Sequence, residues 1–289
     1  MPIDQLLLMI NDLGQMGAQE ICLNAQGEPS SHPQFAQIVN AIKDAGMLLT
    51  INTNLALSSP KITAALGRTD NLAINISAVN QESYQEIMGP VAKGSLNNVI
   101  KNLAYLRSLE KPPSYKLIYI ITKNNFYLMG ETIEFARTNG IPFITFKIAH
   151  TTSETQGLSL KPQERILFLK SISKLMQQSH GIRTNLRELF NEFFTKENVA
   201  VPFNHCYIGW LTVDIHQNGA VGACCQNTKL KIGNWKNNTL REIWNSPQAQ
   251  EVRLLAKDHF HLKKTFGTSC SHCYFAKKNA QIESLLNDQ

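Results

Sequence analysis

Residues 21–52 read ICLNAQGEPSSHPQFAQIVNAIKDAGMLLTIN. Two short apolar runs, Ile21–Asn24 and Met47–Asn52, enclose a stretch from Phe35 to Ala45 whose apolar residues recur with the period of a helix. Gly27-Glu28-Pro29 closes the first run, and Gly46 ends the helical stretch. This order predicts a strand, a helix and a second strand, which is the βαβ unit of a parallel sheet.

The same alternation continues to about residue 150. Further strands are predicted over 72–77, 115–122 and 143–148, and helices over 2–16, 60–66, 82–87, 95–109 and 127–139. The strand runs are nearly continuous in apolar residues, which is typical of strands covered on both faces. A doubly wound sheet and a (β/α) barrel both fit this pattern. No glycine-rich phosphate loop follows the first strand, which argues against a nucleotide-binding Rossmann domain.

Composition limits the class of protein. The chain has 289 residues, of which 43% are hydrophobic and 17% charged, with a net charge of +6. Two domains are expected at this length, and a disordered charged chain or a charged coiled coil is excluded. No apolar run approaches the ~18 residues of a membrane span. Because the basic residues are scattered, we expect no nucleic-acid partner. Because the chain shows neither such a run nor the pattern of a signal peptide, we expect no membrane and predict a cytoplasmic protein.

Five of the six cysteines lie in the last third of the chain, although disulfides are rare in the cytoplasm. Cys270 and Cys273 form a C-x-x-C pair, and a hairpin of residues 210–215 and 220–223, turning at Asn218-Gly219, would bring Cys206 and Cys224 together. Four such thiolates suit a tetrahedral metal or a cubane cluster.

Two alternatives stay open for these cysteines. Their spacing does not separate structural zinc from an iron–sulfur cluster, and scattered cysteines also occur as small core residues. Cys225 points away from Cys224 if that segment is extended, and Cys22 lies on a predicted strand. We therefore leave Cys22 and Cys225 out of the metal site.

The residues after the first predicted strand resemble a motif of the radical S-adenosylmethionine (SAM) enzymes. In that family a Gly-Gly-Glu-Pro turn follows the second barrel strand and binds the amino group of SAM. Gly27, Glu28 and Pro29 match this turn, and Gln26 stands in place of its first glycine. A carboxylate and exposed carbonyls at the end of a strand suit an ammonium group.

The stretch from Cys206 to Cys273 is similar to the cluster domain called SPASM, in its shorter Twitch form. The matching features are Cys206-Tyr207-Ile208-Gly209-Trp210, Gly219 before Cys224, Ile232-Gly233-Asn234, the segment 239–246 and the final C-x-x-C pair. The Twitch form holds one auxiliary four-iron four-sulfur cluster on four cysteines. The full SPASM form has three more cysteines after that pair, and none follows Cys273 here.

Weaker matches lie between these two motifs. Asn52 and Asn54 resemble the polar end of the family's third strand, and Ser77 resembles a ribose-binding serine after the fourth. Asn124 is a candidate for the ribose or the carboxylate of SAM. Met88 stands where relatives often carry an arginine. For each of these candidates the alternative is a polar residue that merely ends a strand.

The loop that defines the family, Cys-x3-Cys-x2-Cys, is not found in the sequence. It would lie before the helix of residues 2–16, and no cysteine precedes Cys22. We interpret the chain as a fragment or shortened gene product, because the residues expected to bind SAM are otherwise present. The alternative is a degenerate member without radical chemistry. A Cys-x3-Cys-x2-Cys sequence in the upstream reading frame would distinguish the two.

The resemblance implies an α/β fold, a partial (β/α)6 barrel of the radical SAM type followed by a small cysteine-rich α+β domain. We expect the barrel over residues 1–150, linking helices over 151–200 and the cluster domain over 201–289. The resemblance also implies SAM and one auxiliary four-iron four-sulfur cluster as cofactors. A second cluster is expected only if the missing loop is present in the full protein.

The implied activity is hydrogen-atom abstraction by a 5′-deoxyadenosyl radical, which modifies or oxidises a peptide, a protein or a small polar metabolite. The auxiliary cluster would accept the substrate electron, and flavodoxin or ferredoxin would supply reducing electrons. The resulting protein is an oxidoreductase or maturase if the cluster loop is present, and no catalytic residue is assigned. The alternative function is a metal-binding module that holds iron–sulfur or zinc.

Overall fold

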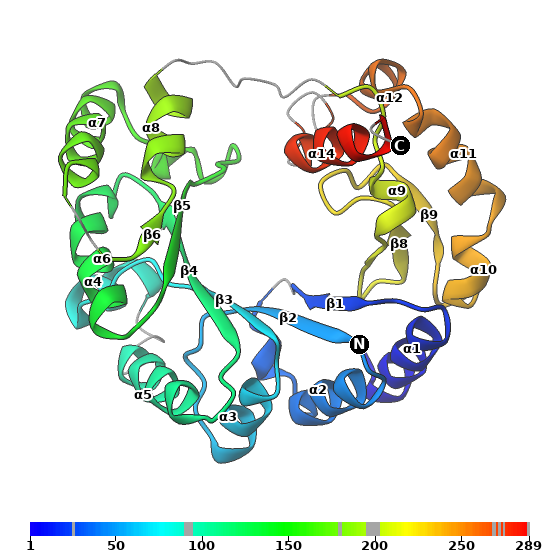
Figure 1. Ribbon diagram of the computed structural model, residues 1–289, viewed down its shortest axis with the longest axis horizontal. Helices are drawn as coiled ribbons and strands as arrows, with labels where there is room; N and C mark the ends of the chain where they lie inside the picture. Colours follow the sequence, from blue (N-terminus) through cyan, green and yellow to red (C-terminus); the bar gives the residue numbers. More distant parts are fainter. Residues whose placement is uncertain are drawn as a thin grey trace. The chain divides into compact units, whose positions relative to one another are not determined.

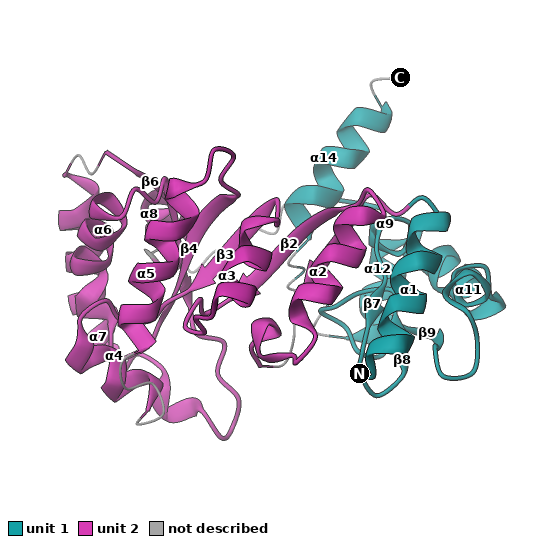
Figure 2. Cartoon of the chain, turned by 90° about the horizontal axis from the view of Figure 1, so that it is seen from below, with its two compact units in different colours: residues 1–17, 197–289 teal, residues 18–196 magenta. Residues whose placement is uncertain are grey.

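The computed structural model describes residues 1–24, 27–89, 95–178, 181–194, 203–267, 270, 273 and 275–287. The chain divides into two compact units, which are coloured separately in Figure 2. Unit 2 is residues 18–196, and unit 1 combines residues 1–17 with residues 197–289. The boundaries of 1–150, 151–200 and 201–289 expected from the sequence stay a prediction.

Unit 2 is built on a six-stranded parallel sheet whose strands follow one another in chain order. This order confirms the barrel-type α/β fold, because a doubly wound sheet reverses its strand order part-way. The strands are β1 (Glu20–Leu23), β2 (Leu48–Thr53), β3 (Asn71–Asn75), β4 (Ser114–Ile121), β5 (Phe143–Ile148) and β6 (Arg183–Thr184).

Helices connect the strands of unit 2. They are α2 (Phe35–Asp44), α3 (Pro60–Gly67), α4 (Gln81–Met88), α5 (Ser95–Ser108), α6 (Met129–Thr138), α7 (Pro162–Met176) and α8 (Leu186–Phe194). Ser59 and Asn80 begin α3 and α4 with side-chain caps that accept hydrogen bonds from backbone N–H groups. Figure 1 shows α2, α3, α5 and α6 on the same side of the sheet.

The two faces of this sheet differ in burial. Leu49, Ile51 and Thr53 of β2 are buried, whereas the residues between them are only half-buried, and β4 and β5 alternate in the same way. The expectation that both faces are covered is met at β3, where Leu72, Ala73 and Ile74 are all buried. It is not met along β2, β4 and β5, whose apolar runs conceal a period of two. The less buried face carries polar side chains, including Thr50, Asn52 and Lys116.

The structure also contains a strand that was not predicted from the sequence. Arg183 and Thr184 form β6, which pairs with Phe143 and Ile144 of β5. The strand lies between α7 and α8, inside the segment expected to hold only linking helices. Two residues are too few to show the period of a strand.

Unit 1 contains a small antiparallel sheet of β7 (Asp214–Ile215), β8 (Ala220–Gly222) and β9 (Lys231–Asn234). The hairpin expected at Asn218-Gly219 is confirmed by the pairing of β7 with β8, and Gly219 takes a φ of +104° in its turn. Trp210 is not part of this hairpin. It lies in the short helix α9 (Ile208–Leu211), so the first predicted strand begins too early.

The remaining helices of unit 1 are α1 (Ile3–Gln15), α10 (Leu240–Trp244), α11 (Pro247–Ala256), α12 (His259–Phe266) and α14 (Ala276–Asn287). The helix α1 belongs to this unit although its partners in α10 lie more than 200 residues later in the sequence. Met9 lies in the core of unit 1, and the Leu240 N–H donates to Asp12 Oδ2 at 3.0 Å. Arg241 donates to the carbonyl of Gln15 at 3.2 Å. These contacts attach the first helix to α10.

A search of the described helices finds none with the length and apolar character that crossing a membrane requires.

Candidate functional site

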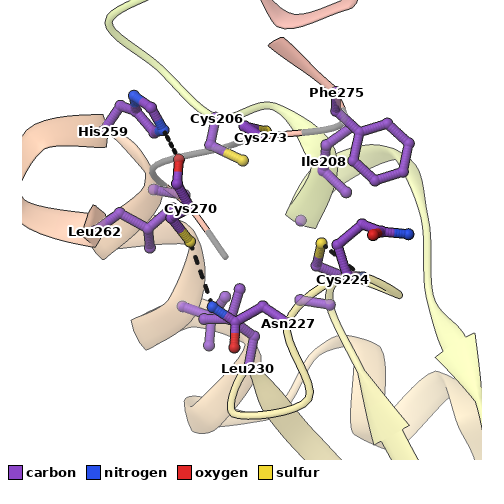
Figure 3. Close-up of a pocket in the computed structure, with 15 residues that line it drawn as sticks. Cys206, Ile208, Cys224, Asn227, Leu230, His259, Leu262, Cys270, Cys273 and Phe275 are labelled. Carbon is purple, nitrogen blue, oxygen red and sulfur yellow. Dashed lines mark hydrogen bonds between the residues drawn. The ribbon is translucent and has the colours of Figure 1, made fainter. Parts of the chain in front are cut away.

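Four cysteines line one pocket in unit 1. Cys206, Cys224, Cys270 and Cys273 surround it together with apolar side chains such as those of Ile208, Leu230, Leu262 and Phe275. In Figure 3 the thiols lie around the same space, contributed by segments that are far apart in the sequence. The structure thus brings together the four cysteines singled out in the sequence.

Hydrogen bonds to other segments of unit 1 hold two of the cysteines in place. The Cys206 N–H donates to the Ala256 carbonyl at 2.8 Å, which attaches the chain before α9 to the end of α11. Cys224 follows β8 directly. The Cys270 carbonyl accepts a hydrogen bond from Nε2 of the buried His259 at 3.2 Å (Figure 3). Three different parts of unit 1 therefore fix the positions of the thiols.

Burial alters the acidity of these thiols. It raises the pKa of Cys206 and of Cys224, and it raises the pKa of Cys273 to about 11, with the neighbouring thiols adding to the shift. At neutral pH without a metal these three side chains are therefore protonated. Metal ligands of this kind must be thiolates, so loading the pocket releases protons.

The arrangement fits a cluster of several metal atoms. The four thiols lie around a pocket lined by apolar groups, and thiolates in an apolar pocket are the usual ligands of a cubane iron–sulfur cluster. Cys225 is exposed and is not among the lining residues.

A second candidate site lies in unit 2, at the carboxyl ends of β1 and β2. Glu28 accepts four hydrogen bonds there. Its Oε1 accepts from the N–H and hydroxyl of Ser30, at 3.1 and 2.7 Å, and from the Thr53 hydroxyl at 2.7 Å. Its Oε2 accepts from the Asn54 N–H at 2.7 Å. The carboxylate thus ties the turn after β1 to the end of β2.

The neighbouring residues of the predicted motif have other roles in the turn. Gly27 has a φ of +121°, which favours glycine, and Pro29 begins the 3-10 turn Pro29–Ser31. Gln26, the counterpart of the family's first glycine, lies outside the described residues. The Thr53 hydroxyl, which the sequence analysis did not identify, is 2% exposed and also accepts from the Leu55 N–H at 2.9 Å.

The loop after β2 is fixed from α5. Leu55 is fully buried with a φ of +57°, a conformation that costs free energy for a leucine. Asn102 donates to the carbonyls of Leu55 and Leu57, both at 2.9 Å, and Asn98 donates to that of Ala56 at 3.0 Å. Asn54 accepts from the Ala56 N–H at 2.9 Å. This network holds the end of β2 in one conformation.

The other predicted residues are more dispersed. Asn52 lies on the less buried face of the sheet, Ser77 is half-buried beyond β3, and Asn124 is exposed. Their roles in SAM binding stay a prediction. Asn125, which was not identified from the sequence, is fully buried and donates to the carbonyls of Ser77 (3.1 Å) and Ile120 (2.9 Å). Its Oδ1 accepts from the Thr122 N–H at 2.7 Å.

We expect Asn125→Asp to destabilise the protein by about 2–4 kcal/mol. The new carboxylate still accepts from the Thr122 N–H. It has no hydrogen to donate to the carbonyl oxygens of Ser77 and Ile120, and its charge is buried. Urea unfolding followed by circular dichroism measures the change. Asn124→Asp adds the same charge at the exposed neighbour and is expected to shift stability by less than about 0.5 kcal/mol. Equal effects of the two changes would contradict the role of Asn125.

Comparison with family models assigns both parts of the chain. Residues 1–136 match the model of the radical SAM superfamily, and residues 206–274 match SPASM, described as an iron–sulfur cluster-binding domain. The second match contains all four cysteines of the pocket, and the first contains the turn of Glu28.

Comparison with curated proteins gives two relatives of the chain. It is 24% identical to an AdoMet-dependent heme synthase of Methanosarcina barkeri, over 95% of the chain and 80% of that protein. It is 29% identical to an S-adenosylmethionine-dependent nucleotide dehydratase of Selenomonas ruminantium, over 45% of the chain and 51% of that protein.

Solved structures show the same fold. Streptococcus suis SuiB matches with a TM-score of 0.63 at 15% identity, over 88% of the chain and 62% of SuiB. The structure of anSMEcpe with bound AdoMet matches with a TM-score of 0.61 at 13% identity, over 89% of the chain and 75% of anSMEcpe. The chain thus spans less than two thirds of SuiB.

Proposed function

Because the chain belongs to the radical SAM superfamily and carries a SPASM domain, we propose that it binds one auxiliary four-iron four-sulfur cluster and SAM. The ligands of the cluster are Cys206, Cys224, Cys270 and Cys273. The observation that carries this assignment is the convergence of four thiols from distant segments on one apolar pocket. A zinc ion would need four sulfurs at about 2.3 Å from one point, whereas a cubane spreads its ligands over four corners.

SAM binds at the carboxyl edge of the parallel sheet, at the turn of residues 27–29. Glu28 holds this turn against β2, and its Oε2 accepts only one hydrogen bond from the described residues. A carboxylate oxygen has room for a second donor, which suits the amino group of SAM. Asn52, Asn54, Ser77 and Asn124 are the further candidates for polar contacts at this edge.

If the full protein holds a second cluster on the missing Cys-x3-Cys-x2-Cys loop, reductive cleavage of SAM bound there would supply the abstraction of a hydrogen atom from the substrate. The substrate is a peptide, a protein or a small polar metabolite, which is modified or oxidised, and the auxiliary cluster accepts its electron. Polar side chains on the less buried face of the sheet support a polar substrate. One matching structure is SuiB bound to the precursor peptide SuiA.

The protein works with a reductant such as flavodoxin or ferredoxin in the cytoplasm. All six cysteines lie in the described part of the chain, and none of them forms a disulfide. Thiol ligands of this kind persist in a reducing compartment.

Anaerobic reconstitution with iron and sulfide tests the metal assignment. We expect brown protein with about four iron and four sulfide in the pocket, because four thiolates complete one cubane. Equilibrium dialysis with labelled SAM tests the second site on the same preparation. A colourless protein that retains one zinc per chain would overturn the cluster assignment. A protein that binds the cluster but has no affinity for SAM would overturn the proposed SAM site and support the alternative function, a metal-binding module.

A further inference from the structure

Two buried asparagines lie beside the cysteine pocket. Asn227 is 3% exposed and belongs to the turn between β8 and β9, and Asn279 is fully buried in α14. A buried amide costs free energy unless its donors and acceptor find partners. The partners of these two side chains therefore indicate their roles.

Asn227 bridges its own turn and a cysteine 43 residues away. Its Oδ1 accepts from the Lys229 N–H at 3.1 Å, and its Nδ2 donates to Cys270 Sγ at 3.3 Å (Figure 3). The turn is itself fixed, because the Leu230 N–H donates to the Asn227 carbonyl at 3.1 Å. The amide group is thus aimed at the sulfur by a rigid backbone.

Asn279 likewise accepts a backbone hydrogen bond with its oxygen and donates to a cysteine with its nitrogen. Its Oδ1 accepts from the Tyr207 N–H at 2.9 Å, and its Nδ2 donates to Cys206 Sγ at 3.9 Å. The Gln226 N–H donates to Cys224 Sγ at 3.4 Å. All four candidate ligands therefore receive an N–H hydrogen bond, because the Phe275 backbone also donates to Cys273, and two of these bonds come from buried side chains.

Such bonds affect a bound cluster unequally in its two redox states. The reduced cluster carries more negative charge on its sulfurs, so an N–H donor stabilises it more than the oxidised cluster. We propose that Asn227 and Asn279 raise the reduction potential of the auxiliary cluster by donating to Cys270 and Cys206. This inference rests on the proposed cluster, and it makes the two asparagines positioning residues for electron transfer.

The test compares the midpoint potential of reconstituted wild-type protein with those of Asn227→Asp, Asn227→Leu and Asn279→Leu, by redox titration followed with electron paramagnetic resonance. Aspartate keeps the oxygen that Lys229 needs and loses the donor, and leucine removes the donor without adding charge. We expect all three variants to have lower midpoint potentials than the wild type. At a fixed solution potential, the ratio of reduced to oxidised cluster should fall roughly three- to tenfold for each hydrogen bond lost.

Asn245→Asp is the matched control, because Asn245 is exposed in the same unit and its Nδ2 donates to the Arg241 carbonyl rather than to a cysteine. Its potential is expected to equal that of the wild type. Wild-type potentials in all three test variants would overturn the inference. Failure of all three to assemble a cluster would also overturn it, by assigning the asparagines to ligand placement alone. Absence of a cluster in the wild type would refute the proposed function instead.

Discussion

Cys270→Ala is expected to abolish the auxiliary cluster, with iron and sulfide falling to a small fraction of the wild-type content. Cys270 is 8% exposed, and no described cysteine other than the three remaining ligands lines the pocket to replace it. Because the free energy of metal binding is also folding free energy, unit 1 should lose several kcal/mol of stability together with its metal. Iron and sulfide analysis, visible absorption and urea unfolding measure the three effects.

Cys225→Ala is the matched control for this experiment. Cys225 follows Cys224 directly, yet it is exposed and does not line the pocket. Iron content and the unfolding midpoint should therefore equal those of the wild type. Iron lost from the Cys225 variant and kept in the Cys270 variant would show that the ligand set is wrong.

Glu28→Gln is expected to weaken SAM binding by roughly ten- to a hundredfold, the range that corresponds to losing one hydrogen bond to a charged group. The amide oxygen can replace Oε1, which serves Ser30 and Thr53. The amide nitrogen then faces the Asn54 N–H. Two hydrogen-bond donors would therefore meet where Oε2 of the carboxylate accepts a hydrogen bond of 2.7 Å. The turn and the end of β2 lose their link, and the acceptor for an amino group is lost with it.

Equilibrium dialysis with labelled SAM measures this effect, and circular dichroism checks the fold. Glu134→Gln removes the same charge from unit 2 at an exposed position, where the carboxylate pairs with Arg137 of its own helix. It should leave SAM affinity unchanged. Equal affinities of wild-type protein and Glu28→Gln would refute the placement of SAM at this turn.

The sequence predicted those parts of the fold that depend on local patterns. Five parallel strands, their connecting helices and the Asn218-Gly219 hairpin were found because apolar periodicity and turn residues act over a few neighbours. The two-residue strand β6 was missed because it is too short to show a period. Trp210 was placed in a strand because a four-residue helix carries equally little signal.

The residues of the candidate site were likewise predictable only where their signal is local. The four cysteines were recognisable because their spacing and side-chain chemistry are specific. Asn125, Asn227 and Asn279 were not, because asparagine is ordinary in turns and only long-range contacts distinguish a buried amide from a solvated one. The asymmetric burial of the sheet likewise depends on what the tertiary structure places over each face.

The packing of α1 against α10 has a consequence for synthesis on the ribosome. The partners of Asp12 and Gln15 are Leu240 and Arg241, so α1 reaches these native contacts only after residues more than 200 positions later have been made. At about 5–20 residues per second, that interval is roughly 10–45 seconds. During this time unit 2 can fold from a continuous stretch of chain, while Met9 and its apolar neighbours remain without their native cover.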